Sequence, residues 1–217
     1  MRVKIQGTII EDGWSKDTNY CHEMYSMILF NLSKDNAKII HEKKRVKRLF
    51  TFSKLYINNY DIHFYISGED KIIKDFINCI MFNQIIRIGD KVINVKNISP
   101  LTNLRKKEEY IFKTDFIINE MKNKKVCLSE NKEYIKRRIL EIAQDKYKII
   151  YDNENLNGFN IDIMSMKQVY TKYKNHHLNS YKSTIKIVGD YDLINLLYNV
   201  GIGENTASGH GFVWEVS

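Results

Sequence analysis

Two segments at opposite ends of the 217-residue chain hold residue types that could act on a phosphodiester. In the first, His41 precedes a run in which five of the residues 43–48 are Lys or Arg. The unperturbed pKa of histidine suits proton transfer near neutral pH. Neighbouring cations would stabilise the negative charge that builds during phosphodiester cleavage. The alternative is a solvated basic helix end that carries a histidine by chance.

The second segment is a glycine-rich stretch near residue 217. Four of the chain's ten glycines form two Gly-x-Gly pairs, five residues apart: Gly201, Gly203, Gly209 and Gly211. Glycine permits positive φ and a close approach of another molecule to the main chain. Such a loop could present backbone N–H groups to phosphate or ribose. His210, inside the second pair, points either to the core or to a ligand, and a tight turn at a sheet corner is the simpler alternative for the whole loop.

The charge balance favours a polyanionic partner, because 34 Lys and Arg face 26 Asp and Glu, a formal net charge of +8. The lysine excess of an AT-rich genome would produce the same number, so charge alone is weak evidence. No run of 18 apolar residues occurs, and the start MRVKIQGTII lacks the pattern of a signal peptide. We therefore expect a folded, cytoplasmic protein with no membrane partner.

Metal and cofactor signals are missing from the sequence. Cys21, Cys79 and Cys127 form no CxxC pair and predict reduced thiols. No pair of histidines has metal-ligand spacing beside a carboxylate. Neither a P-loop nor a dinucleotide-binding glycine pattern occurs. The sequence thus predicts no bound metal and no organic cofactor.

Hydrophobic periodicity predicts an α+β fold built from two similar halves. In the first half, strand patterns at residues 3–9, 49–52, 61–66 and 86–98 alternate with helical patterns at 24–32 and 72–81, which is close to the βαββαβ order of a ferredoxin-like unit. The single proline, Pro100, and the polar run 102–109 mark a boundary between domains 1–100 and 101–217. In the second half we expect strands at 110–116, 147–151, 159–166, 184–188 and 212–216, helices at 135–143 and 190–200, and a loop at 172–181.

The two segments together resemble the CRISPR-associated precursor-crRNA endoribonucleases of the RAMP superfamily. The loop matches that family's pattern of Gly-h-Gly, five residues, Gly-h-Gly, although the family usually has an aromatic residue where His210 stands. The early match runs from Asn19-Tyr20-Cys21-His22 through Ile39-Ile40-His41-Glu42 to Leu49-Phe50-Thr51-Phe52-Ser53. The resemblance implies tandem ferredoxin-like (RRM-like) domains and metal-independent cleavage of CRISPR repeat RNA. In that reaction a ribose 2′-hydroxyl attacks the phosphate, leaving 2′,3′-cyclic phosphate and 5′-hydroxyl ends.

The resemblance also assigns roles to residues. His41 falls on the family's catalytic histidine, and Lys47 or Arg48 on its phosphate-stabilising cation. Phe30 stands where many members have a tyrosine, so either Tyr25, one turn earlier, or His22 substitutes for it, or the enzyme relies on His41 and the cations alone. In the second half, Arg137 and Arg138 are candidate phosphate contacts, with ordinary surface charge as the alternative for each.

Two other functions compete with repeat-RNA cleavage. The first is a non-catalytic RAMP-type RNA-binding subunit of a CRISPR effector complex, which would share the fold and the glycine loop. The second is a small-molecule enzyme on a ferredoxin-like scaffold, which the missing cofactor motifs argue against. Besides repeat RNA, the partners we consider are effector-complex subunits and a second copy of the chain.

Overall fold

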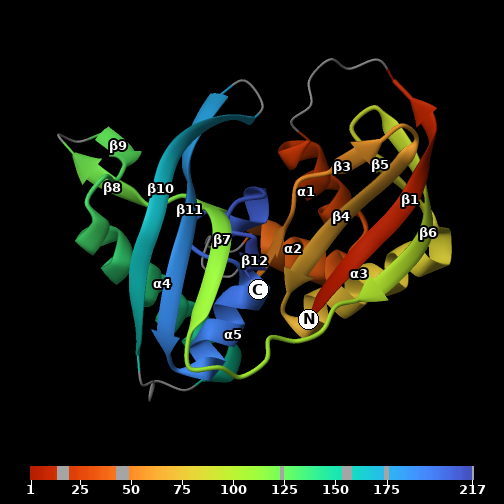
Figure 1. Cartoon of the computed structure of the whole chain (residues 1–217). Helices are drawn as coiled ribbons and strands as arrows, with labels where there is room; N and C mark the ends of the chain where they lie inside the picture. The colour runs from red at the N-terminus through yellow and green to blue at the C-terminus, as the bar shows by residue number, and fades with distance from the viewer. Residues whose placement is uncertain (14–19, 43–48, 123–124, 153–157, 174–175, 217) are drawn as a thin grey trace.

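A computed structural model describes residues 1–13, 20–42, 49–122, 125–152, 158–173 and 176–216. Within these ranges, the side chains of residues 41–42, 122, 125–126, 171–173 and 176–178 are outside the description. The fold is α+β and has antiparallel sheets, as the hydrophobic periodicity predicts (Figure 1). The predicted class is confirmed.

The first sheet is built from residues 2–100 in the strand order β2-β4-β1-β6-β5, with β3 also paired to β4. The strands are β1 (Arg2–Asp12), β2 (Phe50–Phe52), β3 (Tyr56–Asn58), β4 (Asp61–Gly68), β5 (Ile85–Ile88) and β6 (Lys91–Pro100). The helices are α1 (Cys21–Phe30), α2 (Lys34–Glu42) and α3 (Asp70–Asn83). If the edge pairs β2/β3 and β5/β6 each count as one strand, this is the order of a ferredoxin-like βαββαβ unit.

The second sheet repeats this arrangement in the order β10-β11-β7-β12. Its strands are β7 (Tyr110–Phe116), β10 (Phe159–Tyr173), β11 (His176–Gly189) and β12 (Val213–Glu215). Its helices are α4 (Lys132–Tyr151) and α5 (Tyr191–Val200), and a small separate hairpin consists of β8 (Asn119–Lys122) and β9 (Lys125–Leu128). β6 ends at Pro100 and β7 begins at Tyr110; the division into domains 1–100 and 101–217 stays a prediction.

Two of the expected elements are wrong. Residues 147–151 form the end of α4 rather than a strand, because Tyr147 continues the buried stripe of Ile139 and Ala143 at helical spacing. The polar run 172–181 is mostly strand, since β10 and β11 form a long hairpin that pairs as far as Tyr173 with His176. Backbone pairing between the two strands stabilises this hairpin, and its polar side chains show no periodic pattern from which it could be predicted.

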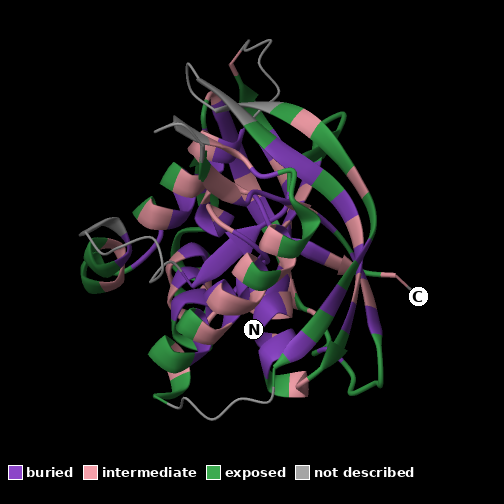
Figure 2. Ribbon diagram, turned by 90° about the vertical axis from the view of Figure 1, so that its left-hand side faces the viewer, coloured by how far each residue is buried: buried purple, intermediate pink, exposed green. Residues whose placement is uncertain are grey.

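Each sheet carries its helices on one face. Val3 and Ile5 of β1 are fully buried and belong to the same core as Phe76 of α3, whereas Lys4 and Gln6 alternate to the other face. In Figure 1 the strands of both sheets lie in front of α3, α4 and α5. Figure 2 shows the buried residues running through the interior between strands and helices. The helix-free faces of the sheets are therefore available for function.

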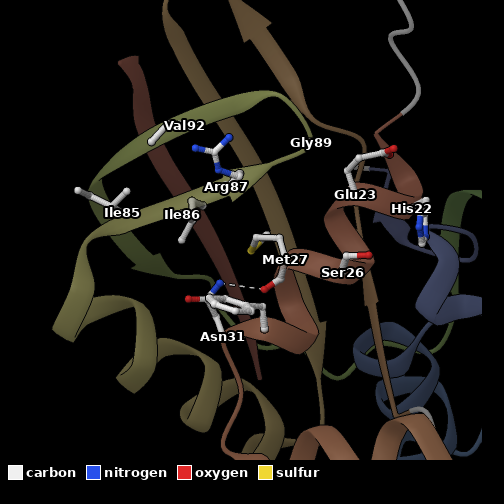
Figure 3. Close-up of a pocket in the computed structure, with 11 residues that line it drawn as sticks. His22, Glu23, Ser26, Met27, Asn31, Ile85, Ile86, Arg87, Gly89 and Val92 are labelled. Atoms are coloured by element: carbon white, nitrogen blue, oxygen red, sulfur yellow. Dashed lines mark hydrogen bonds between the residues drawn. The ribbon is translucent and has the colours of Figure 1, made fainter. Parts of the chain in front are cut away.

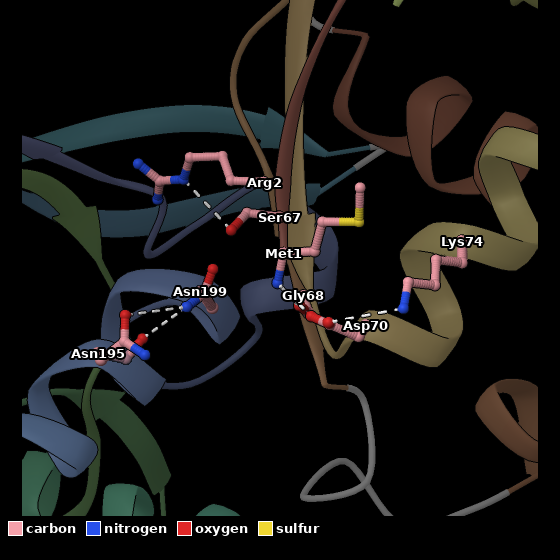
Figure 4. Close-up of polar contacts among 8 residues, drawn as sticks. All are labelled: Met1, Arg2, Ser67, Gly68, Asp70, Lys74, Asn195 and Asn199. Carbon is pink, nitrogen blue, oxygen red and sulfur yellow. Dashed lines mark hydrogen bonds and ion pairs between the residues drawn. The ribbon is translucent and has the colours of Figure 1, made fainter. Parts of the chain in front are cut away.

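A buried arginine joins the two halves of the molecule. Arg2 on β1 is 3% exposed; it donates through Nε to Ser67 Oγ (3.3 Å) in its own sheet, as Figure 4 shows. Its Nη1 and Nη2 donate to the carbonyl oxygens of Val213 (2.9 Å) and Tyr198 (2.6 Å) in the other half. The guanidinium also lies over the rings of Tyr198 and Phe212, at 3.7 and 4.2 Å. One planar side chain thus ties the start of β1 to α5 and β12.

Candidate nucleic-acid interface

The glycine loop between α5 and β12 depends on backbone conformations that other residues rarely adopt. All four motif glycines have positive φ: +86° at Gly201, +84° at Gly203, +81° at Gly209 and +77° at Gly211. A Cβ added to Gly211 would lie 2.2 Å from the carbonyl oxygen of Ile202. The two Gly-x-Gly pairs lie against each other, because Ile202 N–H donates to Gly211 O at 2.9 Å.

The loop packs on the early segment that the sequence singles out. A Cβ on Gly209 would lie 2.8 Å from Phe52 Cε2 and 3.0 Å from Cys21 Sγ. Thr51 Oγ1 donates a hydrogen bond of 3.1 Å to the carbonyl oxygen of His210. The LFTFS run, residues 49–53, and the glycine loop are therefore direct neighbours, although about 150 residues separate them in the chain.

A lysine lies beneath the loop. Lys146 of α4 is 3% exposed, and its Nζ donates to the carbonyl oxygen of Gly201 at 3.4 Å. Burial lowers the pKa of this amine to about 7. The amine therefore donates a hydrogen bond to the beginning of the glycine loop, and it changes between its charged and neutral forms near pH 7.

A polar cluster lies behind the loop. His210 is 2% exposed, so it points to the core rather than to a ligand, and its Nδ1 lies 3.8 Å from Asp115 Oδ1. That distance is too long for a hydrogen bond. The two nitrogens of His210, Asp115 Oδ1 and the Oγ of the buried Ser180 lack hydrogen-bond partners within the described residues. Burial raises the pKa of Asp115, but the nearby polar groups of His210 and Ser180 and the charge of Lys54 lower this pKa by more, so that the net shift is downward.

A hollow of about 570 Å³, the central cleft, lies beside this cluster. Residues after β2 line one side of it, and Gly209, Phe212, Trp214 and the helix-free face of the second sheet line the other. Among the described residues that line it, four are lysines and one is a carboxylate: Lys54, Lys113, Lys167, Lys182 and Asp115. Such a cleft is electrostatically suited to a polyanion.

Aromatic rings form one wall of the central cleft. Trp214 meets the ring of Tyr65 edge-on at 4.7 Å and that of Phe212 at 4.9 Å. Tyr56, across the cleft, stacks on His63 at 4.7 Å. Aromatic faces beside cations are what single-stranded nucleic acids bind, since bases stack while phosphates pair with lysines.

The predicted catalytic residues lie mainly outside the described residues. The backbone of His41 belongs to the last turn of α2, but its side chain is not described, and Lys47 and Arg48 fall wholly outside the description. Tyr25 of α1 is partly buried and stacks on Phe50, with the ring centroids 6.3 Å apart. Phe50 begins the LFTFS run, so Tyr25 does lie beside this segment.

The remaining predicted RNA contacts fall into two groups. Of the motif glycines, Gly209 lines the central cleft, whereas Gly201, Gly203 and Gly211 are buried. Arg137 and Arg138 lie on α4 and both approach Glu141, at 3.5 and 3.0 Å. Arg138 also approaches Glu204 of the loop at 3.7 Å. Their contact with RNA stays a prediction.

A second hollow, of about 600 Å³, lies between α1 and the β5–β6 hairpin. Figure 3 shows His22, Ser26 and Asn31 on the helix side of this hollow, opposite Ile85 and Arg87. Arg87 is the one Lys or Arg among the described residues that line it, and none of these lining residues belongs to the glycine loop. In the described part of the chain, no three His, Cys, Asp or Glu side chains gather where one metal ion could bind them.

Sequence reasoning missed the lysines of the central cleft. Lys113, Lys167 and Lys182 stand on three different strands, and each is an ordinary surface charge when taken alone. The detectable signal was the period of two in β7, where Lys113 and Asp115 alternate with the buried Phe112 and Phe116.

None of the described helices is long and apolar enough to cross a membrane.

Comparison with known proteins gives consistent matches. A curated relative, CRISPR-associated endoribonuclease Cas6 1 of Methanocaldococcus jannaschii, is 25% identical over 199 residues, covering 83% of this chain and 78% of the relative. A Cas6-related protein from Pyrococcus furiosus superimposes with a TM-score of 0.83 at 21% identity, covering 100% of this chain and 98% of that one. A RAMP protein described as binding different RNA substrates superimposes with a TM-score of 0.82 at 18% identity, with both chains fully covered.

These two structural likenesses show the fold, and the family follows from the sequence match. Residues 83–214 match the family model described as CRISPR associated protein Cas6, C-terminal, which is more than half of the chain. The match includes the second sheet and the whole glycine loop, the elements that form one wall of the central cleft. The chain therefore belongs to the CRISPR-associated Cas6 family.

Proposed function

We propose that this Cas6-family protein is an endoribonuclease that cuts CRISPR repeat RNA into mature crRNA. Its curated relative is named an endoribonuclease, which supports RNA processing in general. The observation that carries the proposal is the packing of the glycine loop on the LFTFS run, beside a cleft with four lysines. RNA bound in this cleft would contact the end of the LFTFS run, where Phe52 and Ser53 line the cleft.

The proposed reaction is metal-independent transesterification. The ribose 2′-oxygen attacks the phosphorus and loses its proton to a base; the P–O5′ bond breaks, and the 5′-oxygen takes up a proton. The products carry a 2′,3′-cyclic phosphate and a 5′-hydroxyl. We assign the proton transfer to the 5′-oxygen to His41 and charge stabilisation on the phosphorane to Lys47 or Arg48. Because the RNA brings its own nucleophile, the protein mainly aligns groups and stabilises charge.

Tyr25 is the proposed partner for the 2′-hydroxyl. It stands on α1 beside Phe50, close to the LFTFS run. Phe30, at the family's usual tyrosine position, is 87% exposed and has no hydroxyl. The missing hydroxyl at Phe30 favours the second candidate function, a non-catalytic RNA-binding subunit of a CRISPR effector complex with the same fold.

The deciding experiment is single-turnover cleavage of labelled repeat RNA in EDTA. We expect the wild-type protein to cut, and His41→Ala to be roughly 10²–10⁴-fold slower with nearly unchanged RNA affinity, because a general acid–base group is lost. Replacing the ribose upstream of the cut by deoxyribose should abolish cleavage and preserve binding.

Ile39→Ala is the matched control, since this side chain is 40% exposed on the same helix and has no proton to transfer. It should cut at the wild-type rate. Tight binding without cleavage by the wild type would establish the non-catalytic candidate. Cleavage of the deoxy substrate would exclude the transesterification mechanism.

A further inference from the structure

The helix-free face of the first sheet carries a row of aromatic and polar side chains that begins at the central cleft. This first-sheet row crosses four strands through directly opposed pairs: Tyr56 with His63, His63 with Gln6, and Gln6 with Asn97. Directly opposed residues lie on one face of a sheet, and Gln6 alternates away from the core. Because Tyr56 lines the cleft, the row continues the cleft across β3, β4, β1 and β6, which Figure 1 shows side by side.

The ring of Tyr56 is held in place and is still accessible. The ring of His63 stacks on it, with the centroids 4.7 Å apart and an interplanar angle of 9°. Tyr65 meets it edge-on, at 6.5 Å and 85°. Tyr56 is nevertheless 40% exposed. A flat ligand that stacks on Tyr56 would meet a ring already fixed by two neighbours, so that little side-chain entropy would be lost on binding.

The neighbours of Tyr56 suit a nucleic acid better than a protein partner. Burial and then the charge of Lys4 lower the pKa of His63, so its imidazole is neutral at pH 7. Lys4 stands directly opposite Tyr65 on the same face and supplies a cation for a phosphate. Gln6 and Asn97 add amide donors and acceptors. None of these residues is apolar, whereas the core of a protein interface is enriched in apolar residues.

The two walls of the central cleft differ in chemistry. Three of the lysines that line it stand on strands of the second sheet, across the cleft from Tyr56: Lys113, Lys167 and Lys182. A single strand of RNA between these walls would turn its phosphates toward the lysines. Its bases would then face the first sheet, where Tyr56 offers a stacking surface.

We propose that the first-sheet row is a binding site for unpaired nucleotides of the RNA that extend from the central cleft, with one base stacked on Tyr56. The inference rests on the proposed RNA-binding function and adds a second binding surface to it. His63 positions the ring of Tyr56, and Lys4 pairs with a phosphate. The ligand is single-stranded, because a duplex encloses the faces of its bases in its own stack. Every base has such a face, so the site binds without a base preference.

The test is fluorescence anisotropy with two labelled eight-residue RNAs. One is oligouridylate, and the other keeps the riboses and phosphates but lacks the bases. We expect Tyr56→Ala to weaken binding of oligouridylate roughly five- to thirtyfold, the usual scale for one base stacked on an aromatic ring, and to change binding of the abasic RNA less than about twofold. Tyr56→Phe and Tyr56→Trp keep a ring and should bind oligouridylate within about threefold of the wild type.

Tyr151→Ala is the matched control, because it removes a tyrosine that is 56% exposed at the end of α4, away from the residues that line the cleft. It should bind both RNAs like the wild type. Unchanged binding of oligouridylate by Tyr56→Ala would overturn the proposal, and so would an equal loss with the abasic RNA. Repeat-RNA binding and cleavage on the same preparations separate the two proposals. If the wild type cuts repeat RNA but Tyr56→Ala keeps its affinity for oligouridylate, the stacking site alone is rejected; if repeat RNA is neither bound nor cut, both proposals are.

Discussion

Lys146, which donates a hydrogen bond to the glycine loop, makes the free energy of unfolding depend on pH. Burial lowers its pKa to about 7, while an exposed lysine titrates near 10.5. Between these two values the unfolded chain holds a proton that the folded protein has released. The free energy of unfolding therefore rises with pH across this window, by up to about 1.4 kcal/mol per pH unit. Below pH 7 both states are protonated, and this contribution to the slope disappears.

Lys146→Met should remove this pH dependence. We expect the difference in unfolding free energy between variant and wild type to change by a few kcal/mol from pH 7 to pH 10, because methionine fills the site without a titrating group. Urea unfolding at several pH values measures it. Lys148→Met, exposed on the same helix, should follow the wild-type curve. Parallel curves for wild type and Lys146→Met would mean that Lys146 keeps its proton when folded.

Other single residues differ in how far the sequence alone could identify them. The four glycines could be selected because positive φ is a local requirement, and a repeated pair of them is rare. His41 could be selected because a histidine before a basic run is itself a chemical pattern. The lysines of the central cleft could not, since Lys113, Lys167 and Lys182 come together only through strand pairing across long stretches of chain.

At the scale of elements, the glycine loop should be intolerant of any side chain. Gly211→Ala places a Cβ against the carbonyl of Ile202 in a backbone conformation that alanine avoids. We expect it to lower the unfolding free energy by more than about 2 kcal/mol in urea unfolding. Gly158→Ala is the control, because it has no positive φ and its nearest neighbour, Leu140, is 3.9 Å away. A fully stable Gly211→Ala would show that the loop has another accessible conformation.

The elements themselves were predictable where their side chains repeat regularly. β1, α3 and α5 follow alternating or helical patterns, so their positions were predicted close to where they lie. The ends of α4 and the β10–β11 hairpin were not, because a helix and a strand of the same hydrophobicity are distinguished by the surfaces against which they pack. The β8–β9 hairpin, four residues a strand, is too short for a periodic signal.

At the scale of the whole molecule, loss of the hydrogen bonds of Arg2 should destabilise both halves. Arg2→Lys keeps the charge but cannot supply three donors in one plane, so the carbonyls of Val213 and Tyr198 lose their partners. We expect a loss of about 2–4 kcal/mol of unfolding free energy, together with a larger radius of gyration in small-angle scattering.

Lys4→Met is the control for Arg2, as it removes a cation from the same face of the same strand. It should change neither the stability nor the radius of gyration appreciably. If Arg2→Lys unfolds like the wild type, the two sheets are held together by the glycine loop and the aromatic wall rather than by the guanidinium.

The position of the glycine loop in the chain also has a consequence for biosynthesis. Gly201 to Phe212 leave the ribosome after both sheets except β12, yet this stretch fills the junction between the two halves and lines the cleft. Domains fold as they emerge, the earlier one first. A nascent chain can thus complete its first sheet and most of its second without having a finished cleft. This order of synthesis defers completion of the cleft until the glycine loop itself has emerged from the ribosome.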